Sequence, residues 1–259
     1  MSFDVGVFHN VDSVNLDVGS VNIKSIHCKH FMKPFKKQTT PKKTKTPTPK
    51  PSMSPTAGYH HGNLREEVLE HSRKVLEKTG VSSLSLRDIA SDLGVSHTAP
   101  YRHFPKKMDL LQALVAEGFR ELALAMKRAW DSSEDPLTKV RIAGEEYIYL
   151  LLNNPRRTEL MFGGEIYVSG DPLSDDLREC GNEAYMGMFR IVEYGQNQLV
   201  LKKSVPTATL MMSFWSGVHG FAVLNERKWK SIQSSEEEKK SFQKEVLQIL
   251  EIMIEGTRL

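Results

Sequence analysis

Apolar residues recur at helical spacing from Tyr59 almost to the C-terminus, and nowhere do they alternate over a length that predicts a strand. A chain with this pattern buries its apolar stripes by packing helix against helix. We therefore expect an all-α fold. Residues 59–106 are predicted to form a three-helix helix-turn-helix domain, and residues 107–259 a C-terminal helical domain.

Capping residues and glycines indicate where the expected helices begin and end. Asn63, with Glu66 three residues later, is expected to cap a first helix that ends at Gly80. Ser85 is expected to cap a short second helix, and Gly94 follows it at a turn that suits a left-handed residue. The remaining helices are predicted near residues 97–103, 107–130, 136–152, 155–162, 174–194, 206–226 and 236–255.

Residues 1–58 differ from the rest of the chain in composition and charge. They contain nine Lys, no Arg and three Asp, a net charge of +6, whereas the whole chain carries +3 and the remainder therefore −3. Their Pro, Thr and Lys run has too few apolar residues to offset the entropy lost on ordering. We expect a disordered basic extension. Whether it belongs to the physiological protein stays open, because Met32 or Met53 could be the start.

Other classes of function lack their motifs in this sequence. No nucleophile-elbow, zinc-helix or phosphate-loop spacing is present, so we expect no enzyme, with a helical enzyme kept as an alternative. No apolar run approaches the length of a membrane span, and the first thirty residues lack a signal pattern. We expect a cytoplasmic protein with no membrane partner.

Cys28 and Cys180 give no disulfide framework. His27, Cys28 and His30 supply only three metal-capable side chains, and we expect neither a metal nor a cofactor.

The segment after Gly94 is short and polar, which makes it poor material for a protein core. Apolar residues on the preceding helix, such as Leu86 and Ile89, would hold the two helices at a fixed angle, as in a helix-turn-helix. Residues 94–107 contain three basic residues, two histidines and no acidic residue, which is typical of a surface that faces phosphates. The side chains left to project from this segment are Ser96, His97, Thr98, Tyr101, Arg102 and His103.

Two stretches of the sequence resemble a known family. "SLSLRDIASDLGVSHTAPYRHFPKKMDLL" resembles the DNA-binding region of TetR-family (tetracycline-repressor-like, TetR/AcrR) transcriptional regulators. Its aromatic, lysine and leucine spacing carries the resemblance: Tyr101, His103, Phe104, Lys107, Leu110 and Leu111. "FWSGVHGFAVL" resembles the Trp-then-His-Gly signature of a C-terminal domain in one branch of that family. The resemblance extends from about Tyr59 to Ile254.

The resemblance implies a role for individual positions in DNA binding. Tyr101 and Lys107 match positions that touch the phosphate backbone, and Arg87 and His97 match positions that reach base edges. Ser85 heads the second helix, whose N-terminal amides could hold a phosphate. Phe104 is expected to pack beneath the motif. His103 could either donate to a phosphate or seal the junction with the next helix. Pro100 stands where many members carry an aliphatic residue.

The resemblance also implies that the second domain dimerises and holds a small ligand. We expect a pocket between the middle helices, although the same side chains could be ordinary core. The candidate ligand-binding residues are Tyr147, Leu151, Met161, Phe162, Tyr185, Phe189, Trp215 and His219. For His219, a position in the core or in an interface is the other interpretation.

The last two helices are predicted to form the homodimer interface. Gly217 and Gly220 would let another helix approach closely, which would explain two glycines inside one helix. The apolar faces expected to meet the second copy are those of Leu210, Met211, Phe214, Val218, Phe221, Val246, Ile249, Leu250 and Met253.

Together these features predict a dimeric, sequence-specific DNA-binding transcriptional regulator. We expect a repressor that binds a near-palindromic operator in double-stranded DNA and is released by an unidentified small-molecule effector. The alternative from another class is a nonspecific DNA-binding protein driven by the basic extension. Deleting residues 1–58 would separate the two, because only a nonspecific binder would lose most of its affinity.

Overall fold

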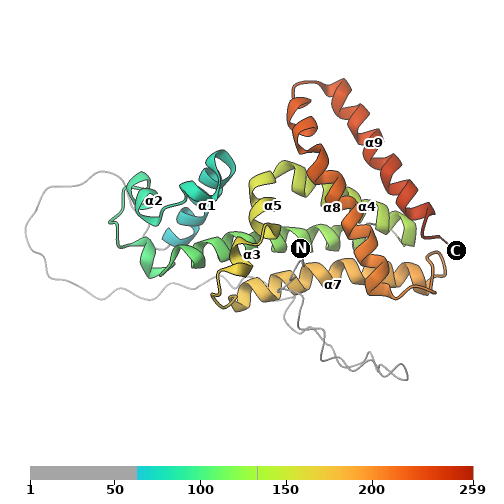
Figure 1. The fold of residues 1–259 in the computed structure, drawn as a ribbon, viewed down its shortest axis with the longest axis horizontal. Helices are drawn as coiled ribbons and strands as arrows, with labels where there is room; N and C mark the ends of the chain where they lie inside the picture. Colours follow the sequence, from blue (N-terminus) through green and yellow to red (C-terminus); the bar gives the residue numbers. More distant parts are fainter. Residues whose placement is uncertain (1–62, 133, 259) are drawn as a thin grey trace, which may run out of the picture. The chain divides into compact units, whose positions relative to one another are not determined.

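The computed structural model describes residues 63–132 and 134–258, and this part of the chain is helical with no strand. A single bridge pairs Leu201 with Arg258. The helices are α1 (Leu64–Thr79), α2 (Leu86–Asp92), α3 (Lys107–Asp131), α4 (Pro136–Asn153), α5 (Pro155–Phe162), α6 (Glu165–Val168), α7 (Asp175–Asn197), α8 (Thr207–Ser231) and α9 (Glu236–Glu255), with 3-10 turns η3 (Val81–Ser83) and η4 (Pro100–Arg102) (Figure 1). The all-α prediction is confirmed. The predicted extension at 1–58, with its candidate metal donors, lies outside the described residues.

Most of the predicted helix ends are confirmed, but α8 continues to Ser231, five residues beyond its predicted end, and Asn63 does not cap α1. The Ser85 hydroxyl accepts a hydrogen bond from the Asp88 amide at 3.3 Å, and Gly80 ends α1 at a φ of +85°. Asn63 precedes α1, but its side chain makes no capping hydrogen bond. Its ψ of 15° departs from the extended backbone from which capping side chains reach the next turn. The predicted capping box at Asn63 is therefore wrong.

The α-helix predicted at residues 97–103 is replaced by a tighter turn. Turn residues lead into η4, whose amides bond three residues back, as from His103 to the Pro100 carbonyl at 3.0 Å. Pro100 has no amide hydrogen, so the α-helical bond from this position cannot form. A 3-10 turn tolerates the proline at its first position, and the Phe104 amide closes the segment on the Pro100 carbonyl at 2.9 Å.

Helix α3 lies at the centre of the packing. It packs most extensively against α7 and also contacts α1, α4 and α5, and Figure 1 shows α1 and α2 grouped near its N-terminal end. A Cβ atom added to Gly118 of α3 would lie 2.4 Å from the Met161 sulfur of α5, so the two helices approach closely there. No helix in the described residues is long and apolar enough to cross a membrane.

A pair of carboxylates ties α5 to both α1 and α3. The Glu77 carboxylate of α1 accepts hydrogen bonds from the Arg157 amide at 3.0 Å and the Arg156 amide at 3.3 Å, both in the first turn of α5. The Arg157 guanidinium donates to Glu121 of α3, with one N–O distance of 2.8 Å. Because the Arg157 side chain is only 6% exposed, this joint between the three helices depends on Glu121 to balance a buried charge.

We predict that Glu121→Gln lowers the free energy of unfolding by about 1–2 kcal/mol. The loss should stay below the roughly 3–5 kcal/mol typical of deeply buried pairs, because Glu121 is 42% exposed and water screens the pair. Urea denaturation measures the difference. Glu70→Gln is the matched control, since its partner Lys74 is 72% exposed and the pair should contribute little. Equal losses in the two variants would contradict the assignment.

Candidate nucleic-acid interface

The second helix presents one buried face and one exposed face. Leu86, Ile89 and Ala90 are buried, whereas Arg87 is exposed. Asp92 at the end of α2 pairs with His71 of α1, with a distance of 2.9 Å between Nε2 and Oδ2. The buried residues and this pair hold α2 against α1, so that Arg87 lies on the side away from the core.

Gly94 makes the turn that separates α2 from the next segment. Its φ of +68° is a left-handed conformation that glycine adopts without strain. The Val95 amide then bonds the Ala90 carbonyl at 2.9 Å, which closes the end of α2. No atom lies within 4 Å of a Cβ placed on Gly94, so the requirement for glycine here is conformational and not steric.

The segment from Ser96 to His103 lies on a buried base and projects polar side chains outward. Pro100 is buried and Phe104 is only 2% exposed, so the prediction that Phe104 packs beneath the motif is confirmed. The Arg65 guanidinium lies 5.4 Å from the centre of the Phe104 ring. The six side chains predicted to project are all exposed: Ser96, His97, Thr98, Tyr101, Arg102 and His103.

Two lysines join this segment to α3, and each already has a partner. The Lys107 ammonium donates to the Val81 carbonyl at 2.9 Å and remains exposed. The Lys106 ammonium donates to Asp171 at 3.0 Å, and this hydrogen bond raises the pKa of Lys106 above its ordinary value. Arg87 and Arg102 have no acidic partner among the described residues, so their charges are available to an outside anion.

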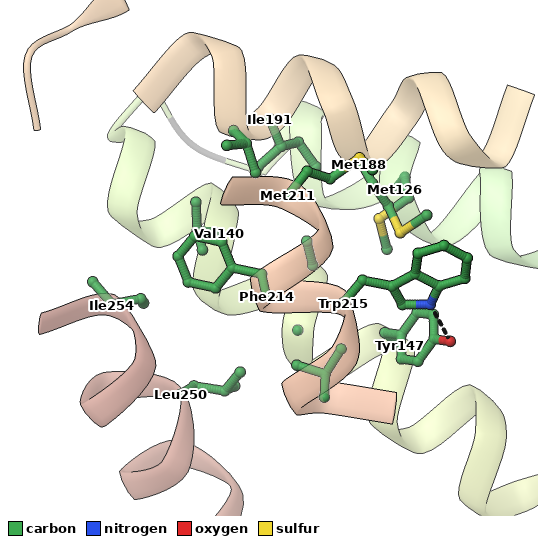
Figure 2. A pocket seen from close by; sticks show the side chains of 14 residues that line it. Met126, Val140, Tyr147, Met188, Ile191, Met211, Phe214, Trp215, Leu250 and Ile254 are labelled. Carbon is green, nitrogen blue, oxygen red and sulfur yellow. Dashed lines mark hydrogen bonds between the residues drawn. The ribbon is translucent and has the colours of Figure 1, made fainter. Parts of the chain in front are cut away.

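The predicted ligand-binding residues do not all meet at one place. Tyr147 and Trp215 line a cavity of about 50 Å³ between α3, α4, α7, α8 and α9 (Figure 2). His219 donates to or accepts from the Tyr147 hydroxyl, with Nδ1 and Oη 3.0 Å apart, and does not line the cavity. The remaining predicted residues also lie outside its lining: Leu151, Met161, Phe162, Tyr185 and Phe189.

Sequence reasoning missed most of the residues around this cavity. Met126 of α3, Val140 of α4 and Met188 of α7 line it together with Phe214 and Leu250. Each belongs to an apolar helical stripe that is visible in the sequence. The stripe predicts burial, but it does not show which of its members borders a gap in the packing.

Tyr185 and Phe189 contact each other instead. Their rings stack along α7 with centroids 6.3 Å apart. Phe162 contacts both Trp215 and His219, with ring centroids 6.1 Å and 4.9 Å apart. Phe162 therefore contacts one residue that borders the cavity, Trp215, and one that does not, His219.

These features define the class of the protein. A capped helix, a glycine turn and an exposed polar segment stand on a buried apolar base, and a larger helical region carries a cavity in its core. This is an all-helical protein with an N-terminal helix-turn-helix. Residues 68–114 match the family of bacterial regulatory proteins called the tetR family. The helix-turn-helix region of this chain therefore matches that of the tetR family.

Individual relatives agree with this assignment. The nucleoid occlusion factor SlmA of Vibrio atlanticus is 29% identical over 124 residues, which are 48% of this chain and 63% of that protein. The chain thus spans less than two thirds of that relative's length. A solved structure of a Rhodococcus sp. RHA1 protein of unknown function covers 78% of this chain, with 26% identity and a TM-score of 0.64. The ketosteroid transcriptional regulator KstR2 of Mycobacterium tuberculosis, at 14% identity and a TM-score of 0.54, shares the fold.

We predict that Tyr101→Ala and Lys107→Ala weaken binding to every DNA sequence about equally, because phosphate contacts position a protein without reading bases. Lys107→Ala should also lower the slope of log affinity against log salt concentration by about one unit per subunit. Fluorescence anisotropy across a salt series measures both quantities. Lys127→Ala, at the far end of α3, removes the same charge and serves as the control. An unchanged slope for Lys107→Ala would contradict the phosphate contact.

We predict that Arg87→Ala and His97→Ala relax the preference for bases at particular positions of the operator. Loss of one base contact typically costs about 1–3 kcal/mol at the affected pair. Selection from a randomised operator library measures the preference, with Arg178→Ala, at an exposed residue of α7, as a charge-matched control for Arg87→Ala. Variants that discriminate as the unmodified protein does would show that other residues read the bases.

Proposed function

We propose that this protein is a dimeric, sequence-specific DNA-binding transcription regulator, and that it acts as a repressor released by a small-molecule ligand. One observation carries the proposal. From Gly94 to Lys107 the side chains predicted to touch DNA are exposed, and this stretch of the sequence contains no acidic residue. A surface of this composition, on a buried base, suits the phosphates and base edges of a major groove.

Domain organisation supports the same proposal. Residues 59–106 would read DNA, and residues 107–259 would dimerise and sense the ligand. The family match continues to residue 114, within α3, so this helix would belong to both functions. The protein would act in the cytoplasm, in keeping with the free thiol of Cys180. A helical enzyme remains an alternative without a site among the described residues to favour it.

The curated relatives favour a second candidate function. A nucleoid occlusion factor is named for an action on the nucleoid as a whole, whereas a repressor controls the genes beside its operator. The distribution of bound sites along the chromosome separates the two functions. A few sites next to promoters would support the repressor, and many dispersed sites would support the nucleoid role.

The outward faces of α8 and α9 support the proposed dimer, but through different residues from those predicted. Leu210, Met211, Val218, Val246 and Leu250 are buried within the protomer, so they belong to its own core. A Cβ atom on Gly217 would meet the Met253 side chain at 2.4 Å, which explains that glycine by packing inside one chain. The prediction that these residues face a second copy is therefore wrong.

Other apolar residues of α8 and α9 remain uncovered. Leu224 is 84% exposed and Ile252 is 67% exposed. On α8, Met212, Gly220 and Val223 share an outward face with Leu224, at the three- and four-residue spacing of a helix. Exposed apolar residues on the last two helices are candidates for a surface that a second copy covers.

A continuous set of contacts could transmit ligand binding to the DNA-binding helices. Trp215, at the cavity, contacts Phe162 at the end of α5, and the first turn of α5 holds Glu77 of α1. A ligand that moves Trp215 would move α5, and α5 is tied both to α1 and to α3. Such a ligand releases DNA only if it binds the non-DNA conformation more tightly, so DNA must weaken ligand binding in turn.

We predict that Leu224→Lys separates the dimer and abolishes tight binding to a two-half-site operator. Burying a lysine ammonium without a partner is costly, so the two copies should separate. The helix-turn-helix of one protomer alone contacts too few base pairs for tight binding. Light scattering gives the mass, and anisotropy gives the affinity for the duplex that the unmodified protein selects. Val168→Lys, at an 82% exposed residue of α6, is the matched control. A Leu224→Lys protein that stays dimeric with full affinity would contradict the proposed interface.

A further inference from the structure

The side chains that line the cavity among the C-terminal helices are almost all apolar. It is bordered by side chains from five helices, among them Met126, Val140, Met188, Phe214 and Leu250 (Figure 2). None of its lining residues carries a charge. Two lining side chains have polar atoms, the Tyr147 hydroxyl and the Trp215 indole nitrogen.

Both polar atoms are already engaged with each other. The Trp215 Nε1 donates to the Tyr147 hydroxyl at 2.6 Å, drawn as the dashed line in Figure 2. The His219 Nδ1 lies 3.0 Å from the same hydroxyl. Burial lowers the pKa of His219 and raises the pKa of Tyr147, so both groups are uncharged near neutral pH. A ligand in the cavity would therefore meet no ion to pair with.

We propose that this cavity binds a compact, uncharged, predominantly hydrocarbon effector. This assignment of ligand class rests on the proposed function, because it takes the cavity as the effector site. An ionised group brought into the cavity would lose its hydration without gaining a partner, which costs far more than burying a methylene gains. A hydrocarbon group instead exchanges water for contacts with the apolar side chains that line the cavity.

The volume of the cavity indicates how such a ligand is accommodated. About 50 Å³ is a third of the roughly 150 Å³ in an engineered apolar cavity that stays dry and binds benzene. Three of the lining side chains are methionines, Met126, Met188 and Met211. Unbranched thioether chains have several rotatable bonds and repack easily. The ligand would enlarge the cavity by rotating these methionines, and the helices would move only as far as the remaining volume requires.

Three probes with one ring and different charges test the ligand class on the full chain: toluene, benzoate and benzylammonium. Titration calorimetry gives the dissociation constants at neutral pH. We expect saturable binding of toluene, with both ions at least roughly tenfold weaker. Benzoate or benzylammonium binding as tightly as toluene, or no binding by toluene, would overturn the proposal.

Two variants that fill the cavity locate the bound probe. Ala143→Leu and Val192→Ile add methylenes at lining residues, and Ala208→Leu repeats the first change at an exposed residue of α8. Toluene affinity should fall at least roughly tenfold in Ala143→Leu and stay unchanged in Ala208→Leu. If Ala143→Leu fails to fold, the smaller Val192→Ile change provides the same test. Unchanged toluene affinity in the folded filling variant would overturn the site.

A parallel measurement separates this proposal from the proposed function. DNA selection by the same protein preparation reports the regulator without any ligand. A selected operator together with preferred binding of an ion would overturn only the ligand class. Toluene binding at the cavity in a protein that selects no DNA sequence would overturn the regulator and leave the chemistry of the cavity standing.

Discussion

The packing of α3 against helices from both ends of the chain is the constraint on which the rest of the structure depends. Its 25 residues span roughly 37 Å, and one end meets the DNA-binding helices while the other lies among the helices that border the cavity. Near its beginning, Lys107 donates to Val81, and further along Glu117 lies 3.5 Å from Arg73 of α1. The Gln112 side chain bonds the Pro172 carbonyl and the Ser174 amide, which holds the start of α7. A rigid helix with these contacts cannot shift at one end without a response at the other.

The charged contacts around α3 indicate which residues would resist or transmit a shift of this helix. Glu117 is half-buried, and burial raises its pKa against the opposing effect of Arg73. Next to it, Arg157 brings a buried charge from α5 to Glu121. These paired charges have little freedom to rearrange one at a time, because each would leave a partner buried and unpaired. The joint between the two domains is therefore suited to moving as a unit, together with α5.

The sequence predicted most helices and many of their ends, and the exceptions have a common physical cause. Ser85, Gly80 and Gly94 marked helix ends because each needs only local geometry, a hydroxyl near free amides or a left-handed backbone. Asn63 has the right side chain but not the backbone angle, and a proline at residue 100 changed the type of helix. Helix α6 was missed because its four residues lie in a glycine-containing stretch between two predicted helices. These failures come from backbone conformation, which side-chain types constrain only in part.

The candidate DNA surface was predictable residue by residue, whereas the cavity was not. An exposed polar segment on an apolar base follows from helical period and charge alone. A cavity depends on how five helices fit, so only Tyr147 and Trp215 of the predicted ligand residues border it. The wrong prediction of the dimer interface has the same cause, because it also depends on how helices fit together. Burial of Leu210 or Val246 was predictable, but whether it would be covered by the same chain or by a second copy was not.

Sequence specificity read by a two-fold dimer is the central claim, and selection from a random pool of DNA duplexes measures it most directly. The full chain and a chain that lacks residues 1–58 would be compared at one salt concentration near 0.15 M, where nonspecific phosphate contacts are screened. We predict that both select the same near-palindrome, with half-sites about 34–36 Å apart or at a longer spacing on the same groove face. A pool without an enriched motif, or binding that disappears with residues 1–58, would contradict the account.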